Sequence, residues 1–117
     1  MEHTVTELIY GVDLVDWMVR LAADDIPCAL YHLPAPRGAA IEVRLCSEEP
    51  VRDFQPSAGT LHEVVFPKDV RVDTWVSSGT VVSPFYDSLV AKVIVHGDTR
   101  EEAIERMHRA LDDTRLI

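Results

Sequence analysis

Hydrophobic and polar residues alternate strictly in the segment 40–46. The apolar positions are Ile41, Val43 and Leu45, and the positions between and after them are Glu42, Arg44 and Cys46. Because successive side chains of a strand point to opposite faces, this pattern predicts a strand with one face toward a core. The other face presents the Glu42 carboxylate and the Arg44 guanidinium about 7 Å apart along the strand. A polar face on a rigid element is the kind of support that a binding or catalytic site needs.

Helical spacing of apolar residues predicts two helices, one near each end of the chain. The first covers about residues 13–24, with Asp13 as N-cap, Asp16 three residues later, and an apolar stripe made of Leu14, Trp17, Met18, Leu21 and Ala22. We interpret Trp17 and Met18 as packing residues, because large side chains at this spacing bury one face of a helix. The second helix begins at Thr99, which forms a capping-box pattern with Glu102, and its stripe consists of Ala103, Ile104, Met107, Ala110 and Leu111.

Further strands are predicted between these helices. Strand patterns cover residues 60–66, 70–76, 81–82 and 89–96. The segment 89–96 is apolar on nearly both faces, which is typical of a central strand, and its one charged residue, Lys92, needs a partner or a route to water. Prolines between residues 23 and 36 predict an irregular linker. The predicted fold class is α+β: a mainly antiparallel, partly barrel-like sheet of about four or five strands with an N-terminal and a C-terminal helix.

Composition and charge limit the classes of function. The 117 residues suit a single domain, and 47% hydrophobic with 26% charged residues is ordinary for a soluble globular protein. A formal net charge of −9 opposes binding to the phosphate backbone of nucleic acid. The sequence shows no long apolar run and no basic-then-apolar leader, so it predicts neither a membrane span nor a secretory signal. Two separate cysteines and scattered histidines indicate no metal site and no disulfide, and a reducing cytoplasm fits best.

The pair Glu42 and Arg44 has two interpretations on its pattern alone. It can be an ordinary solvated ion pair on the outer face of an antiparallel sheet, contributing about 0–1 kcal/mol to stability. It can also belong to a binding or catalytic site. The alternation itself leaves both interpretations open.

Longer motifs around this pair resemble a known family. They read R-G-A-A-I-E-V-R at residues 37–44, D-F-Q-P-S-A-G at 53–59 and P-F-Y-D-S-L-V-A-K at 84–92. In this order they are similar to the C-terminal domain of biotin carboxylase, the ATP-dependent component of biotin-dependent carboxylases. The segments at residues 72–75 and 95–104 look most like urea carboxylase and the related acyl-CoA carboxylase α chains.

The start of the chain resembles the last part of the ATP-grasp domain of the same enzymes. Residues 2–7 read E-H-T-V-T-E, with Thr4 where most members have proline, and residues 11–14 read G-V-D-L. The resemblance therefore implies that residues 1–36 are a remnant of the ATP-grasp domain plus a linker. Residues 37–117 would be the biotin carboxylase C-terminal domain, truncated at its end.

The resemblance also implies roles for individual residues. Arg44 matches a catalytic, biotin-binding arginine, and Glu2 matches the base that deprotonates bicarbonate. Glu42 and Asp87 would orient the guanidinium of Arg44. Each has an alternative: Glu42 and Asp87 can be solvated acids, and Glu2 can be a frayed, solvated terminal carboxylate.

The implied reaction needs groups that this chain does not supply. ATP and bicarbonate give carboxyphosphate, which releases carbon dioxide to the biotin enolate, whose oxygen Arg44 stabilises. Biotin and ATP with Mg²⁺ are thus the implied cofactors of the complete enzyme, but no phosphate-binding glycine loop occurs here. We expect the isolated chain to have no ligase activity without an ATP-grasp half, supplied by the same parent chain or a separate one.

Other partners and functions follow from the same comparison. A biotin carrier domain is an implied partner, and a homodimer is a further possibility because family members often dimerise. The alternative function is a non-catalytic accessory or relic module from a truncated gene, structural in a carboxylase complex. A carrier domain itself is disfavoured, because Lys92 lies inside an apolar strand rather than on a hairpin tip.

Overall fold

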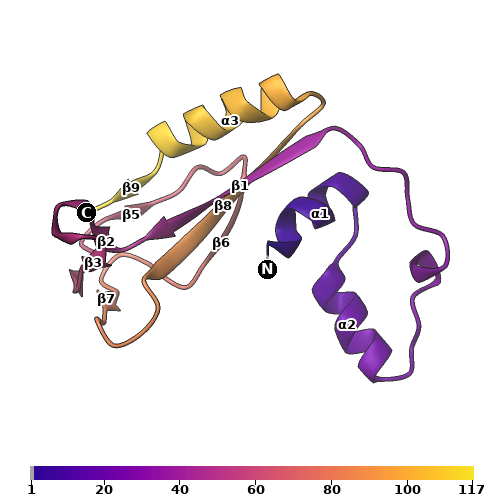
Figure 1. The fold of residues 1–117 in the computed structure, drawn as a ribbon, viewed down its shortest axis with the longest axis horizontal. Coiled ribbons are helices and arrows are strands. Elements are labelled where there is room, and N and C mark those ends of the chain that lie inside the picture. Colours follow the sequence, from indigo (N-terminus) through magenta and orange to yellow (C-terminus); the bar gives the residue numbers. More distant parts are fainter. Residues whose placement is uncertain (1) are drawn as a thin grey trace.

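The computed structural model describes residues 2–117, and its centre is an antiparallel three-stranded sheet (Figure 1). Strand β8 (Leu89–Gly97) lies in the middle, between β1 (Ala39–Cys46) and β6 (Arg71–Thr74). The central position predicted for residues 89–96 is confirmed. All eight residues of β1 pair with β8, with a register shift only at the Leu45/Cys46 end, so β1 is a rigid support.

The register separates the sheet into an apolar and a polar face. Val93 of β8 lies opposite Val43 of β1 and Val72 of β6. The next residue of β8, Lys92, lies opposite charged residues of both neighbouring strands. Because side chains alternate along a strand, these two rows point to opposite faces of the sheet. The predicted alternation in β1 thus extends across all three strands.

A helix covers each face of this sheet (Figure 1). On the apolar face, helix α3 (Arg100–Asp112) packs its buried residues against β8 in a core made of Val93, Val95, Ala103, Met107 and Ala110. On the polar face lies helix α1 (His3–Tyr10), which contacts β1 and β8. A second core of Val76, Val82 and Val90 lies at the other end of β8.

Two helix starts follow the predicted capping patterns. The side chain of Asp13 accepts a hydrogen bond of 2.8 Å from the backbone N–H of Asp16 at the start of α2 (Leu14–Ala22). The Thr99 hydroxyl accepts one of 3.2 Å from the backbone N–H of Glu102 at the start of α3. Helix α1 was not predicted from the sequence. No side chain caps its N-terminus, and it ends at Gly11, whose φ of 64° suits glycine.

The interpretation of Met18 as a packing residue is wrong for this chain. Helix α2 has no buried residue, and Met18 is 70% exposed. In Figure 1 the helix projects away from the sheet, and three residues of its apolar stripe, Met18, Leu21 and Ala22, are exposed. Trp17 is half-buried. Helical spacing identified the stripe correctly but could not supply a neighbour for it.

The remaining strands form short antiparallel pairs. These are β2 (Glu48–Glu49) with β3 (Gln55–Pro56), β4 (Gly59–Thr60) with β7 (Val81–Val82), and β5 (Val64–Val65) with β9 (Arg115–Leu116). The predicted strand 60–66 is therefore split between two pairs. The α+β class is confirmed, but within residues 2–117 the sheets do not close, so the partly barrel-like arrangement is not found. Pro56 and Pro67 help to keep the pairs short, because proline cannot donate a backbone hydrogen bond.

Two short 3₁₀ helices complete the chain. They are η1 (Cys28–Leu30), in the proline-containing linker, and η2 (Pro50–Arg52), between β2 and β3. No helix within residues 2–117 is long and apolar enough to cross a membrane.

Candidate functional site

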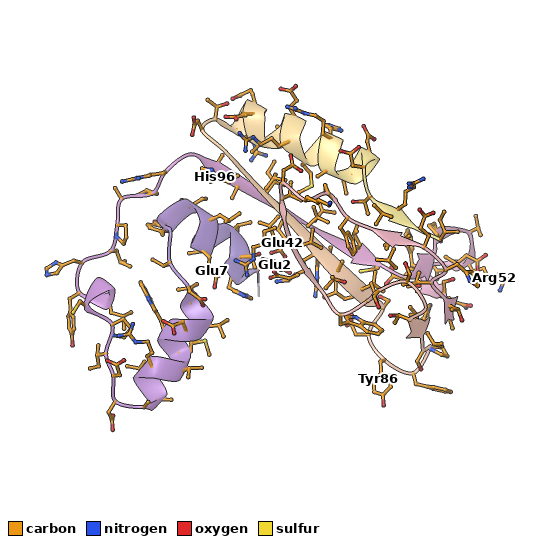
Figure 2. All side chains as sticks on the ribbon, turned by 180° about the vertical axis from the view of Figure 1, so that it is seen from behind. Glu2, Glu7, Glu42, Arg52, Tyr86 and His96 are labelled. Atoms are coloured by element: carbon orange, nitrogen blue, oxygen red, sulfur yellow. The ribbon has the colours of Figure 1, made fainter. Side chains whose placement is uncertain are left out.

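Charged side chains gather where α1 meets the polar face of the sheet. Figure 2 shows Glu2, Glu7 and Glu42 in this region. Strand β1 carries Glu42 and Arg44, β8 carries Lys92, and the residue before α1, Glu2, completes the group. Strand register places Lys92 opposite Arg44, and the packing of α1 against β1 and β8 brings Glu2 to the same place, about 90 positions from Lys92 in the sequence.

Glu42 is the buried member of this group. Its side chain is only 3% exposed, and its Oε2 atom accepts a hydrogen bond from the hydroxyl of Thr4 and lies 3.7 Å from Nζ of Lys92. Its Oε1 atom is buried and has no hydrogen-bond donor among residues 2–117. Burial, followed by a hydrogen bond with Glu2, raises the pKa of Glu42 above the ordinary value for glutamate. Glu42 is thus a poorly solvated acid beside a second acid.

Arg44 and Glu2 form the open side of the same group. Nε of Arg44 lies 3.6 Å from Oε1 of Glu2, and the two side chains are 55% and 42% exposed. The hydrogen bond with Glu42 lowers the pKa of Glu2, and the positive charge of Arg44 contributes in the same direction. A guanidinium and a carboxylate are therefore held together at the surface, where both can reach a ligand.

A second cluster of ion pairs attaches α1 to the sheet. Arg71 on β6 donates to both carboxylate oxygens of Asp73, at 3.0 Å each, and its Nη1 lies 2.6 Å from Oε2 of Glu7. The other oxygen of Glu7 accepts a hydrogen bond of 2.9 Å from the backbone N–H of Leu14. Pairing with Arg71 lowers the pKa of Asp73. This cluster fixes the position of α1, and with it the position of Thr4 and Glu2.

The predicted site residues are only partly brought together. Glu2, Glu42 and Arg44 share one site, whereas Asp87 lies in the connection before β8, exposed, with its Oδ1 accepting a hydrogen bond of 2.8 Å from the backbone N–H of Leu89. The ion partner of Arg44 is Glu2, whereas Glu42 contacts Thr4 and Lys92. The orienting roles expected for Glu42 and Asp87 stay predictions.

Sequence reasoning missed several residues of the site. Thr4 and Glu7 lie in the unpredicted helix α1, and nothing local marks them as buried. Arg71 was part of an alternating strand pattern and gave no sign of its two acidic partners. Lys92 was the one usable signal, because a charge in a central strand needs a partner, and Glu42 proves to be that partner.

Two cavities of the described chain are not lined by Arg44. The larger, about 620 Å³, is lined by residues including Asp69, His96 and Arg106, and the smaller, about 420 Å³, by residues including Tyr10 and Arg37. Neither is lined by Glu2, Glu42 or Arg44. Candidate ligand chemistry therefore rests on the exposed charged group itself.

The donors and acceptors present fit an anionic oxygen better than a metal ion. The exposed guanidinium of Arg44 offers N–H groups with fixed positive charge, which suit an oxyanion or a carboxylate. Within residues 2–117 no three histidine, cysteine, aspartate or glutamate side chains are placed to hold a metal ion.

Comparisons with known proteins match nearly the whole chain. Residues 42–117 match the family model of the biotin carboxylase C-terminal domain. The urea amidolyase of Lachancea kluyveri is 52% identical over 114 residues, which are 97% of this chain and 6% of the relative. The crystal structure of Kluyveromyces lactis urea carboxylase superposes with a TM-score of 0.94 at 49% identity, over 99% of this chain and 10% of the other.

A more distant solved structure has the same fold. It is the biotin carboxylase domain dimer of Hydrogenobacter thermophilus 2-oxoglutarate carboxylase in complex with MgADP, ADP and bicarbonate. The TM-score is 0.91 at 36% identity, over 100% of this chain and 26% of that one. The chain thus spans a tenth or less of the length of the urea amidolyase and the urea carboxylase, and about a quarter of the 2-oxoglutarate carboxylase domain.

Proposed function

Because this chain belongs to the biotin carboxylase C-terminal domain family, we propose that it contributes Arg44 and Glu2 to the ATP- and bicarbonate-dependent carboxylation of biotin. The observation that carries this proposal is the exposed ion pair between the two residues, with 3.6 Å between Nε of Arg44 and Oε1 of Glu2. A cation and a base side by side on a rigid strand and helix start are the two groups that this reaction needs from this part of the enzyme.

Arg44 acts in this proposal as a fixed positive charge. Bound biotin would supply the ureido nitrogen that receives the carboxyl group. Negative charge that develops on an oxygen next to that nitrogen would lie beside the guanidinium. Because β1 is paired with β8 along its length, the backbone that carries the guanidinium is fixed, and the contact with Glu2 orients the side chain. An arginine also stays charged at every relevant pH.

Glu2 acts as the base. Its carboxylate takes the proton from the O–H group of bicarbonate, and Arg44 helps to keep it ionised before that step, because the guanidinium lowers its pKa. The same guanidinium attracts the bicarbonate anion to the site. The bicarbonate named in the 2-oxoglutarate carboxylase structure is consistent with this assignment.

The nucleotide half of the site would come from outside this chain. We assign residues 1–36 to the end of an ATP-grasp domain with its linker and residues 37–117 to the C-terminal domain. The ATP-grasp half then holds ATP and Mg²⁺, as MgADP in the 2-oxoglutarate carboxylase structure suggests. The small share of each relative that this chain covers supports an ATP-grasp half in the same parent chain.

The similarity to urea amidolyase and urea carboxylase favours urea as the final carboxyl acceptor. A biotin carrier domain would bring the biotin to Arg44 and take the carboxyl group away. The dimer named for the 2-oxoglutarate carboxylase domain supports a homodimer as a further assembly state. These partners belong to the proposal for the complete enzyme.

The test mixes this chain with a separately expressed ATP-grasp half of a related carboxylase. Biotin- and bicarbonate-dependent ATP cleavage should appear only in the mixture, and Arg44→Ala should reduce it about 10²- to 10³-fold, because one donor to a developing oxyanion is lost. Arg52→Ala is the matched control. Arg52 is also an exposed arginine, paired with Glu49, but it lies at the far end of the molecule (Figure 2).

Two outcomes would contradict the proposal. The first is an equal loss of activity in Arg44→Ala and Arg52→Ala. The second is a mixture without ATP cleavage although circular dichroism shows the chain to be folded, and this result would favour a non-catalytic accessory or relic module.

A further inference from the structure

We propose that Glu2 and Glu42 bind protons as one pair, in which the buried Glu42, held by Thr4 and Lys92, is a positioning residue for the base. This inference rests on the proposed function of Glu2 and deepens it. It gives the strand motif around Arg44 a second role besides carrying the guanidinium.

The first support is the incomplete hydrogen bonding of Glu42. Its carboxyl group is 3% exposed, yet both contacts, from Thr4 and Lys92, are made to Oε2. Oε1 has no donor within residues 2–117. A buried acceptor without a donor is destabilising, because it loses its hydration without replacement, and native proteins rarely retain one. A proton shared with a neighbouring carboxyl would satisfy this atom.

The second support is the neighbour that can share that proton. Glu2 lies beside Arg44, Glu42 lies beside Lys92, and Figure 2 shows the two glutamates together at the start of α1. Two acids this close cannot both be ionised without repulsion, so they take up protons as a unit. Burial together with Glu2 raises the pKa of Glu42, whereas the hydrogen bond between the two lowers the pKa of Glu2.

Charged groups on α1, β1, β8 and β6 surround the pair. Arg44 on β1 and Lys92 on β8 favour the ionised pair, and His3 on α1 acts in the same direction when it is protonated. On β6, Arg71 and Asp73 are bound to each other and largely cancel. Burial and mutual repulsion outweigh these cations at Glu42, because the net direction of its pKa shift is upward.

The pair changes the strength of the base. When Glu2 takes the proton from bicarbonate, the O–H bond of bicarbonate breaks, an O–H bond forms on Glu2, and the proton is held between the two carboxyl groups. No electrons are exchanged with another centre. Because the repulsion between two anions is relieved, the pair binds this proton more tightly than a lone exposed glutamate would. A stronger base suits proton removal near neutral pH.

A direct test follows the carboxyl carbons of the 117-residue chain by ¹³C NMR during a pH titration. We expect Glu42 to titrate at higher pH than the exposed glutamates and Glu2 to show two steps. Glu42→Gln should reduce the titration of Glu2 to one step, at a lower pH than the upper step of the pair. Glu49→Gln changes an exposed partner of Arg52 and should leave the two steps of Glu2 unchanged. A Glu42 that titrates with the exposed glutamates in the folded chain would overturn the pair.

Thr4→Val gives a second, nearly isosteric variant. It removes the hydroxyl donor from the ionised form of Glu42 but keeps both carboxyl groups, so the pKa of Glu42 should rise further. An unchanged or lowered Glu42 pKa in Thr4→Val would count against the pair even if Glu42→Gln did not fold.

The pH dependence of ATP cleavage in the reconstituted mixture separates this inference from the proposed function. Glu42→Gln removes the upper of the two protonation steps of the pair, so the acid limb of the kcat profile should move to lower pH, and the rate at neutral pH should fall about tenfold because a single carboxyl group binds the proton less tightly than the doubly ionised pair. An active mixture whose acid limb is unmoved by Glu42→Gln refutes the pair but leaves the roles of Arg44 and Glu2 standing. A wild-type mixture without activity refutes those roles, and the NMR titration still decides the pair.

Discussion

The two faces of the central sheet use the same three strands for opposite purposes. Under α3 the covered surface is apolar, with Val93 and Val95 packed against small and flexible side chains of the helix. Under α1 the contacts are ionic, with Glu42 near Lys92 and Arg71 bound to Glu7. Adjacent positions of one strand therefore serve either the core or the candidate site. The chemistry is placed on a scaffold that the other face stabilises.

The energetics of the two faces differ in kind. Burial of apolar surface stabilises by roughly 25 cal/mol per Å² and depends little on which apolar neighbour provides the cover. Ion pairs gain little net free energy, because each charge loses its hydration, but they require particular partners in particular places. Most of the stability should therefore come from the α3 face, and most of the specific geometry from the α1 face.

The largest expected effect on stability is on the apolar face. Met107 of α3 is 6% exposed and belongs to the core beneath the helix. Met107→Ala should lower the free energy of unfolding by about 3 kcal/mol through lost burial and a cavity. Urea denaturation followed by circular dichroism measures this change. A loss below about 1 kcal/mol would show that α3 can collapse onto the sheet and that this face is less tightly packed than its burial indicates.

A smaller loss is expected on the polar face. Arg71→Met removes the partner of the buried Glu7 and of Asp73 while keeping an unbranched side chain of similar length. We expect a loss of about 2 kcal/mol, below the range for fully buried pairs because the guanidinium is partly exposed. The same denaturation experiment measures it. No loss would mean that α1 is held by something other than these ion pairs.

The pH dependence of this variant sharpens the comparison. Pairing with Arg71 lowers the pKa of Asp73 from 3.8, so the unfolded chain binds that proton more readily than the folded chain does. Stability from this pair is therefore present above about pH 4 and is lost as the pH falls through the lowered pKa. Arg71→Met should flatten this part of the stability profile, whereas Met107→Ala should shift the whole profile by a constant amount.

The same contrast explains what the sequence could predict. Alternation identified β1 and β8, and the caps at Asp13 and Thr99 were found, because these signals lie within a few residues of one another. Helix α1 was missed because it lacks a side-chain cap and buries polar residues, Thr4 and Glu7, rather than an apolar stripe. Local patterns report apolar burial well and polar burial poorly.

For the candidate site, the sequence motifs supplied Arg44, Glu2 and Glu42, and the structure brings these three together. The contacts among them could not be predicted, because they depend on how the start of helix α1 packs against β1, about 40 residues later in the chain. The partly barrel-like sheet was predicted and is not found, for the same reason. Closure depends on long-range pairing, and the outer strands pair over two residues each.

The smallest effect on stability is expected at an exposed methionine of helix α2. Met18 on α2 and Met107 on α3 are methionines within amphipathic helices, but Met18 is 70% exposed. Met18→Ala removes almost no buried surface, and alanine is the better helix former by a few tenths of a kcal/mol, so the free energy of unfolding should change by less than about 0.5 kcal/mol.

The pair of Met→Ala variants therefore holds the substitution constant and varies only the neighbours. If Met18→Ala instead destabilised the chain by more than about 1 kcal/mol, α2 would have to pack against the rest of the chain in solution. The measured difference between the two variants is then a direct estimate of what the sheet contributes to a helix of this kind. A sequence pattern alone cannot give that quantity, because both stripes have helical spacing.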